Sequence, residues 1–201
     1  YAFQHCSALT SVSIPNSVIA INGGAFAYCS ALSSITLPEG LTAITSSLFS
    51  NCSSLTSINI PTGVTRLDYG AFYDCRKLVE INIPEGVTTI QSDVFVRTAI
   101  TSVTLPSSLK TIGGYAFGEC NQLRETHYAG DIAAWCGIYF EDGSSNPICQ
   151  SRNLFINGQK ITDLVIPSTV TTIGQYAFYG CNGFSTLTIG TGLTSIGTYA
   201  F

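Results

Sequence analysis

The sequence predicts a solenoid, in which one chain winds into stacked coils of about 23 residues and each coil adds a strand to a parallel sheet. Prolines recur at a fixed spacing, because Pro15, Pro38, Pro61 and Pro84 are evenly spaced and Pro106 follows at nearly the same interval. Apolar residues recur at fixed distances from each proline, and a phenylalanine followed by a cysteine closes most repeats. Self-similarity at a period of roughly 20–30 residues is typical of coils that stack on one another.

The segment before each proline is predicted to be a strand. Its apolar residues lie two apart, with a polar residue between them, which is the alternation of a strand with one buried face. Proline then ends the strand, because it has no N–H to offer the neighbouring strand. The residues three and one before the proline are Val12 and Ile14, Ile35 and Leu37, Ile58 and Ile60, Ile81 and Ile83, Val103 and Leu105, and, in a later copy, Leu164 and Ile166.

The segment after each proline carries a second apolar pair and then a phenylalanine, with a cysteine usually three residues further on. A spacing of three places phenylalanine and cysteine on one side of a turn, so we expect short helical turns here. One repeat cannot bury its own apolar face, but like residues from successive coils can cover one another. The cysteines at this repeat position are Cys6, Cys29, Cys52, Cys75, Cys120 and Cys181.

The repeat resembles that of a known family. Leu55-x-x-Ile58-x-Ile60 has the spacing of a leucine-rich-repeat strand. Together with the Ile-Pro and Ala-Phe-x-x-Cys elements, it resembles the BspA-like leucine-rich-repeat proteins over residues 1–128 and 161–201. The resemblance implies a β-rich leucine-rich-repeat solenoid of the α/β horseshoe class. It also implies a bacterial surface protein, in a family often tied to adhesion.

The domain organisation follows from the phase of the repeat. We interpret residues 1–201 as a single solenoid cut from a longer array, because the chain begins Tyr1-Ala2-Phe3 and ends Tyr199-Ala200-Phe201 in the same phase. Residues 129–160 form an irregular insertion within this solenoid. One repeat near residue 95 lacks its cysteine, so Thr98 or Ala99 must fill the gap in that column.

The insertion contains two recognisable local signals. Asp131 and Gly137 bracket a short apolar stretch, which predicts a helix with an aspartate N-cap and a glycine terminator. Asn157-Gly158 stands between two apolar runs, which predicts a hairpin that returns the chain to the repeat strand at residues 161–166. We therefore expect an elaborated coil here, not a second domain.

The composition excludes two classes of partner. Only 10% of the 201 residues are charged, and the formal net charge of −4 argues against nucleic acid, which needs a basic binding surface. No apolar run approaches the ~18 residues of a membrane span, so no membrane insertion is expected from this segment. The family resemblance implies an extracellular location, either secreted or on the cell surface.

The eight cysteines fall into two groups. The six at one repeat position are predicted to stack as buried thiols that behave as small apolar side chains. A zinc site is disfavoured, because zinc sites use closely spaced Cys and His pairs. Cys136 and Cys149 lie outside this column, and two interpretations remain open for them: a local disulfide in an extracellular protein, or free thiols.

The candidate binding surface is the outward side of the repeat strands together with the insertion. Most outward residues are small and polar, but charged and aromatic residues gather toward the insertion, and tryptophan and tyrosine are the residue types that most often carry binding energy. Trp135 has a second interpretation, as the buried core of the insertion. The candidate partner-binding residues are Glu80, Arg124, Glu125, His127, Trp135, Tyr139, Phe140 and Asp163.

Glu125 and Asp163 could form a carboxylate pair. If the coils on either side of the insertion stack directly, the two residues would be neighbours and could bind a cation. The alternative is that both are solvated surface groups or that the insertion separates their strands. A cation such as Ca²⁺ needs several more oxygen ligands than this pair supplies.

No catalytic group of residues emerges from the sequence. The chain has only two histidines, and no motif places a nucleophile on a strained turn or supplies an oxyanion hole. No glycine-rich phosphate loop precedes a helix. We therefore predict that the chain is not an enzyme, with no catalytic residue, no cofactor and no metal.

The predicted function is recognition. A solenoid offers a long, rigid surface without a deep pocket, which suits a non-enzymatic adhesion module that binds host proteins, extracellular matrix or a neighbouring bacterial surface. Two alternatives stay open. One is a passive spacer, since the surface is bland. The other is carbohydrate binding, for which aromatic residues such as Tyr1, Tyr115, Tyr176 and Tyr199 would have to line a groove.

Overall fold

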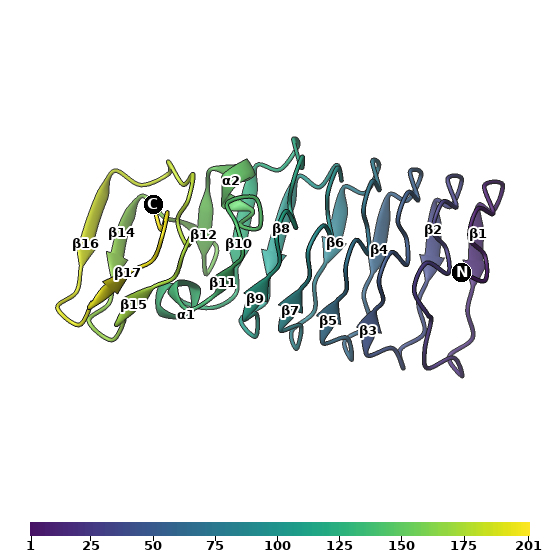
Figure 1. Ribbon diagram of the computed structural model, residues 1–201, viewed down its shortest axis with the longest axis horizontal. Coiled ribbons are helices and arrows are strands. Elements are labelled where there is room, and N and C mark those ends of the chain that lie inside the picture. Colours follow the sequence, from purple (N-terminus) through teal and green to yellow (C-terminus); the bar gives the residue numbers. More distant parts are fainter.

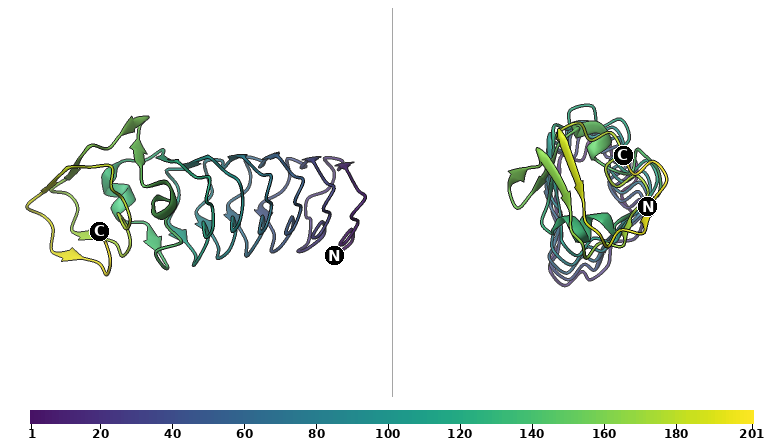
Figure 2. Two further views of the ribbon diagram at one scale, coloured as in Figure 1. Left: turned by 90° about the horizontal axis from the view of Figure 1, so that it is seen from above. Right: turned by 90° about the vertical axis from the view of Figure 1, so that its left-hand side faces the viewer.

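The computed structural model describes residues 1–201, and the chain winds into an elongated rod of stacked coils. The coils follow one another from the N-terminal end to the last coil without crossing (Figure 1). Viewed along the rod, each coil encloses a core and has three sides (Figure 2). We call these sides the strand face, the second sheet and the turn face. The leucine-rich-repeat solenoid predicted from the sequence is confirmed.

The strand face contains the strands that precede the prolines. They run parallel, and equivalent residues of neighbouring coils are paired, as in Val12 with Ile35 and Ile58 with Ile81. Apolar residues point inward and serine, threonine and asparagine point outward, as the alternation predicted. The strands are β1 (Ser11–Ser13), β2 (Ser34–Thr36), β4 (Ser57–Asn59), β6 (Glu80–Asn82), β8 (Ser102–Leu105), β10 (Glu125–Tyr128), β12 (Leu154–Ile156), β14 (Asp163–Ile166) and β16 (Thr186–Ile189).

The second sheet is built from shorter parallel strands that follow the prolines. Each contributes one inward apolar residue, such as Ile44, Leu67 or Ile90, and one residue at the surface. Five strands form a continuous sheet, and the last two form a separate pair. They are β3 (Ala43–Ile44), β5 (Arg66–Leu67), β7 (Thr89–Ile90), β9 (Thr111–Ile112) and β11 (Tyr139–Phe140), followed by β15 (Thr172–Ile173) and β17 (Ser195–Ile196).

The turn face carries the phenylalanines, and its turns are not helical, so the expectation of short helical turns is wrong. A residue with positive φ stands two before and two after the phenylalanine, as at Ser47 (55°) and Asn51 (61°) around Phe49. A left-handed residue cannot continue a right-handed helix. The N–H of Phe49 instead donates to the carbonyl of Ala71 in the next coil, at 2.9 Å. The turns are thus joined by their own ladder of hydrogen bonds.

The core consists of columns of like residues, as the sequence predicted. Phenylalanine rings of successive coils stack with centroids 5.2–5.9 Å apart from Phe3 to Phe117. Each buried thiol of the cysteine column donates to the carbonyl of the phenylalanine in the preceding coil, as Cys75 does to Phe49 at 3.1 Å. Thr98 fills the position without a cysteine, where its hydroxyl donates to the Phe95 carbonyl at 2.8 Å.

The irregular segment forms one complete coil over residues 129–157, which we call the insertion coil. Thr126 is paired with Leu154, so this coil is longer than a regular one such as that between the paired residues Val12 and Ile35. It contains the only helices, α1 (Ile132–Cys136) and α2 (Ile148–Ser151). Asp131 caps α1 by accepting a hydrogen bond from the Ala134 N–H at 2.7 Å, and Gly137 ends it, as predicted.

The predicted hairpin is also present. Strand β12 pairs with the antiparallel strand β13 (Gln159–Lys160) through a turn in which Asn157 and Gly158 have φ values of 50° and 73°. The hairpin projects outward from the strand face (Figure 2). Because β13 occupies the free edge of β12, the next repeat strand, β14, pairs with β16 and not with β12.

Side chains of the insertion coil hold the last coils in place. The Trp135 indole N–H donates to the Ala177 carbonyl at 2.7 Å, and the Asn146 amide donates to the Tyr176 carbonyl at 2.8 Å. On the second-sheet side, the Gly174 N–H donates to the Cys136 carbonyl at 2.9 Å. These bonds replace the strand pairing that is missing between β12 and β14.

Candidate functional site

A shallow hollow of about 340 Å³ lies on the strand face around Glu80. It spans β4, β6 and β8, and polar groups of Asn59, Asn82 and Thr104 line it with the carboxylate. The polar groups that line it are exposed, so the hollow is a shallow surface depression. It places Glu80 where a partner that lies across the strands would contact it.

An aromatic stack lies two strands from Glu80. The His127 ring on β10 stacks on the Phe155 ring on β12, with centroids 4.5 Å apart and an interplanar angle of 23°. The two residues are paired in register and both point outward. The imidazole Nε2 of His127 also lies 2.9 Å from a Glu125 carboxylate oxygen, which helps to fix the orientation of the ring.

Phe155 was missing from the candidate residues, although a signal for it exists. It stands on the apolar run before Asn157-Gly158, two residues before the turn. Pairing that run with the preceding repeat strand would have placed it beside His127. The greater length of the insertion coil concealed this register, because the regular coils keep an almost constant length.

Arg124 and Asp163 make local contacts at opposite ends of this region. The Arg124 guanidinium donates to the Asn121 carbonyl at 2.9 Å, in its own loop. Asp163 accepts hydrogen bonds from the Thr162 and Thr186 hydroxyls, and its strand is paired with β16. Glu125 and Asp163 are not neighbours, because β12 lies beside β10 and β13 occupies the far edge of β12, so the direct pair considered from the sequence does not form.

The remaining three candidates separate into core and surface. Trp135 and Phe140 are completely buried, with ring centroids 5.4 Å apart, and no partner can reach either side chain. Their assignment as contact residues is therefore wrong: Trp135 forms the core of the insertion coil, as its second interpretation held, and Phe140 packs against it there. Tyr139 is 52% exposed, but it lies on the second sheet beside Thr111, on a different side of the rod from His127.

All eight cysteines are free thiols, including Cys136 and Cys149. The thiols in the middle of the column are buried, but Cys6 is exposed and Cys181 is only partly buried, so the prediction of six buried thiols is wrong at both ends of the column. Burial raises the pKa of the Cys52 thiol from 9.0 to about 12 and that of Cys120 to about 11. These thiols are therefore protonated and unreactive at neutral pH. No group of three or more His, Cys, Asp or Glu residues could hold a metal ion.

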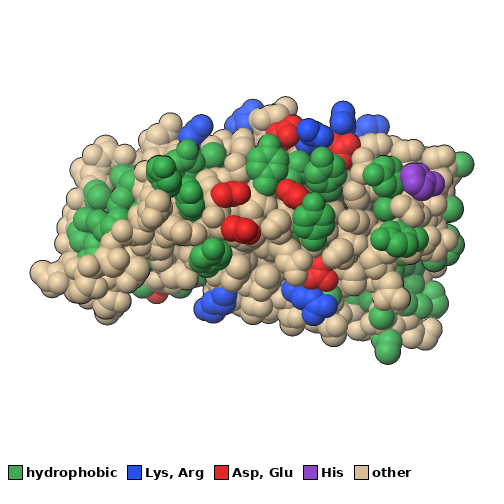
Figure 3. Space-filling view, in the orientation of Figure 1, with side chains coloured by type: hydrophobic (Ala, Val, Ile, Leu, Met, Phe, Trp, Pro, Cys, Tyr) green, Lys and Arg blue, Asp and Glu red, His purple; other side chains and the backbone are tan.

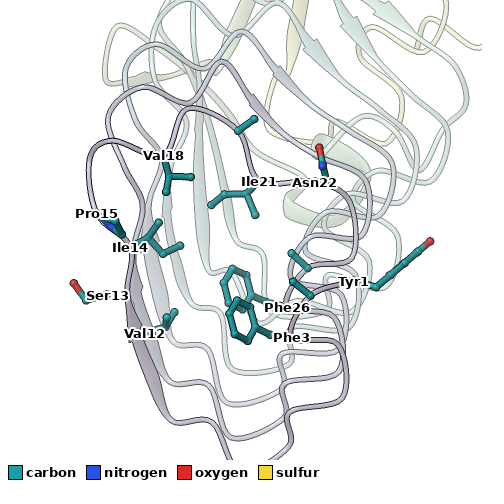
Figure 4. Close-up of a pocket in the computed structure, with 13 residues that line it drawn as sticks. Tyr1, Phe3, Val12, Ser13, Ile14, Pro15, Val18, Ile21, Asn22 and Phe26 are labelled. Atoms are coloured by element: carbon teal, nitrogen blue, oxygen red, sulfur yellow. The ribbon is translucent and has the colours of Figure 1, made fainter.

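The largest apolar groove is the N-terminal end of the core and not a separate ligand site. It has a volume of about 410 Å³, and its lining residues stand at the core positions of the repeat. Val12, Ile14, Val18, Ile21 and the stacked rings of Phe3 and Phe26 point into it, whereas Ser13 points away (Figure 4).

The turn face differs in character from the strand face. Both termini lie on this side, across from the hairpin (Figure 2). Exposed tyrosines gather here, and on the face shown in Figure 3 hydrophobic and acidic side chains lie next to one another along the rod. Arg97 forms a two-pronged ion pair with Glu119, at 2.8 and 3.1 Å, and the Tyr115 hydroxyl donates to the same carboxylate.

A comparison with family models decides the classification. The model described as a BspA type leucine rich repeat region matches six copies, over residues 1–124 and 151–201. The chain belongs to the BspA-type leucine-rich-repeat family. The gap in the match, residues 125–150, covers β10 and most of the insertion coil. No curated protein matches this BspA-type chain.

Several solved structures are similar to this BspA-type solenoid. A leucine-rich repeat protein from Bacteroides ovatus is 21% identical with a TM-score of 0.58, and the match covers 94% of this chain and 57% of that one. The T. pallidum leucine-rich repeat protein is 23% identical with a TM-score of 0.58, covering 94% and 73%. The pneumococcal vaccine antigen PcpA is 20% identical with a TM-score of 0.59, covering 96% and 48%. At these identities the likeness shows the fold alone. Neither helix of the BspA-type chain is long and apolar enough to cross a membrane.

Proposed function

We propose that this BspA-type solenoid is a non-enzymatic recognition module of a secreted or surface-anchored bacterial protein. Its partner is a protein, either of a host matrix or of a neighbouring bacterial surface. The observation that carries the proposal is the projecting hairpin, which sets the His127–Phe155 stack beside an otherwise flat polar strand face. Membership of the family supports the surface location, as does the vaccine antigen among the structural neighbours.

The contact surface comprises the hollow around Glu80 and the stack formed by Glu125, His127 and Phe155. A partner that lies across the strands would bury the Phe155 ring and meet hydrogen-bonding groups in the hollow. Interfaces of this kind draw most of their energy from a few aromatic and charged residues surrounded by near-neutral contacts. The single repeat unit recurs along the rod, but the hairpin occurs once, so it sets where the partner binds.

The test is a binding screen of the purified chain against immobilised fibronectin, laminin, fibrinogen and collagen by surface plasmon resonance. For a partner that binds, we expect the double variant H127A/F155A to lose at least about tenfold in affinity. Tyr139→Ala is the matched control, because it removes an exposed aromatic ring from the second sheet. Affinity that falls with Y139A and not with H127A/F155A would reject the strand face as the contact surface.

A passive spacer is the alternative role. It predicts no saturable binding to any matrix protein and no effect of either variant. The solenoid would then act only through its length and stiffness. This role can be tested by attaching the chain between a known adhesive domain and a bead. The distance from the bead at which the adhesive domain binds its ligand would then measure the length of the solenoid as a spacer.

A further inference from the structure

A pocket of about 370 Å³ opens on the turn face where the insertion coil meets the last coils. It lies on a different side of the rod from the His127–Phe155 stack and is independent of the proposed protein-binding surface. Its lining residues are Asp142, Gly143, Ser144, Cys149, Tyr176, Tyr179 and Tyr199.

The pocket lies beside Gly143, which interrupts a column of tyrosines in the last coils. Tyr115, Tyr176 and Tyr199 each stand two residues before the phenylalanine position of their coil. In the insertion coil the Phe117 N–H donates to the Ser144 carbonyl, where the Phe95 N–H donates to that of Ala116 one coil earlier. Ser144 thus takes the place of Ala116, and Gly143 takes the place of Tyr115. The Tyr179 ring packs against Gly143, where an added Cβ would lie 2.6 Å from the Tyr179 Cε1, so only a glycine lets the ring lie there.

The tyrosines around this space form a corner. The Tyr176 and Tyr199 rings are nearly parallel, at 20° with centroids 5.5 Å apart. The Tyr179 ring stands across both, at 89° to Tyr176 and 72° to Tyr199. Tyr199 is 64% and Tyr179 36% exposed. The corner therefore offers apolar ring faces with phenol hydroxyls at their edges.

The opposite side of the pocket is a rigid polar loop. The Asp142 carboxylate accepts hydrogen bonds from the Ser145 N–H at 2.7 Å and the Tyr115 N–H at 3.0 Å. The Ser145 hydroxyl donates back to the Asp142 carbonyl. A carboxylate has about four acceptor sites, so these bonds fix Asp142 and leave it able to accept from a ligand. A loop held in this way loses little freedom when it binds.

We infer that this pocket binds a sugar ring of a glycan. A pyranose has an apolar C–H face, which suits the tyrosine rings, and hydroxyls around its edge, which suit the Asp142 carboxylate and the phenol hydroxyls. An organic ammonium group is the competing ligand for an aromatic site. The Ser145 and Tyr115 N–H groups that donate to the Asp142 carboxylate partly offset its negative charge, which weakens its attraction for a cation. The geometry therefore favours the neutral sugar.

The test is an array of defined bacterial and mammalian oligosaccharides, followed by calorimetric titration of the strongest one. We expect Tyr176→Ala and Tyr179→Ala each to weaken binding at least about tenfold, because each removes one wall of the corner. Tyr69→Ala is the matched control, since Tyr69 is an exposed tyrosine outside the pocket, and it should change affinity less than about twofold. Circular dichroism checks that each variant is folded.

A second measurement locates the bound sugar. Cys149 lines the pocket and is half-buried, so a bound oligosaccharide should slow its alkylation by iodoacetamide, read from its peptide by mass spectrometry. The inference would be overturned if no oligosaccharide bound on the array, or if the Tyr176 and Tyr179 variants bound as tightly as the unaltered chain. Displacement of the bound oligosaccharide by choline chloride would overturn it as well. None of these results bears on H127A/F155A, so the glycan and protein proposals fail separately.

Discussion

The same residue type behaves differently along one column of the solenoid. Cys75 is completely buried between coils, and its thiol donates to the Phe49 carbonyl at 3.1 Å. Cys6 occupies the same repeat position in the first coil and is exposed. The repeat spacing predicted this column and its packing. It could not predict how well each member is covered, because that depends on the neighbours on both sides.

This contrast gives a stability prediction. We expect Cys75→Ala to lower the free energy of unfolding by about 1–2 kcal/mol, because it leaves a small cavity in the core and removes one of the two hydrogen bonds to the Phe49 carbonyl. Cys6→Ala should change it by less than about 0.5 kcal/mol, as surface substitutions usually do. Urea unfolding followed by circular dichroism measures both. Equal effects of the two variants would contradict the packing account.

The buried thiols also predict a loss of stability in alkali. The folded-state pKa of Cys52 is raised to about 12 and that of Cys120 to about 11, above the ordinary value of 9.0. As the pH rises past 9, the unfolded chain releases these protons and the folded chain keeps them. The unfolded state then binds fewer protons, so stability falls between about pH 9 and pH 12. Stability below pH 8 should not depend on these groups.

Thermal unfolding between pH 7 and pH 11 tests this dependence. The single variants Cys52→Ala and Cys120→Ala should each flatten the alkaline decline, whereas Cys6→Ala should leave it unchanged. A decline of the same steepness in all of the variants would assign it to other groups.

At the scale of elements, the insertion coil shows where prediction from the sequence ends. The capped helix and the Asn157-Gly158 hairpin were found because each depends on a few adjacent residues. The position of β12 in the strand face was not predicted, because the insertion coil is longer than the regular coils. In addition, no proline follows β12, and Ser151 stands where the repeat has leucine. Ser151 is still accommodated in the core, because its hydroxyl lies 2.8 Å from that of Thr126.

The hairpin turn controls the candidate site and can be tested alone. Gly158 has a φ of 73°, which a β-branched residue adopts at a cost of about 1–2 kcal/mol. We expect Gly158→Val to open the hairpin, to speed amide hydrogen exchange at residues 154–160 and to weaken partner binding through loss of the Phe155 position. Asn157→Gly keeps a turn that favours positive φ and is the control. Normal exchange in G158V would show that the turn does not hold β12 in place.

At the scale of the whole molecule, the rod is a chain of coils in which each contacts its neighbours, so its stability is the sum of local terms and junctions. The junction after the insertion coil is the one at which a hairpin strand, β13, occupies the edge of the preceding repeat strand, so β14 cannot pair with β12. Hydrogen bonds of Asn146 take the place of much of the missing strand pairing. The Asn146 amide donates to the Tyr176 and Ala177 carbonyls at 2.8 and 3.0 Å, and its oxygen accepts from the Ile148 N–H.

We therefore expect Asn146→Ala to uncouple residues 161–201 from the rest of the rod. The substitution removes the Asn146 bonds to the last coils and leaves the buried Ile148 N–H without its acceptor, at a cost of about 1–3 kcal/mol that falls on one junction only. Hydrogen exchange should then show faster opening of β14 to β17 with little change in β1 to β9, and urea unfolding should separate into two steps. Asn59→Ala, an outward asparagine on β4, is the control. If N146A instead opened every coil equally, the coils would unfold as one unit, and the junction would not limit the stability of the last coils.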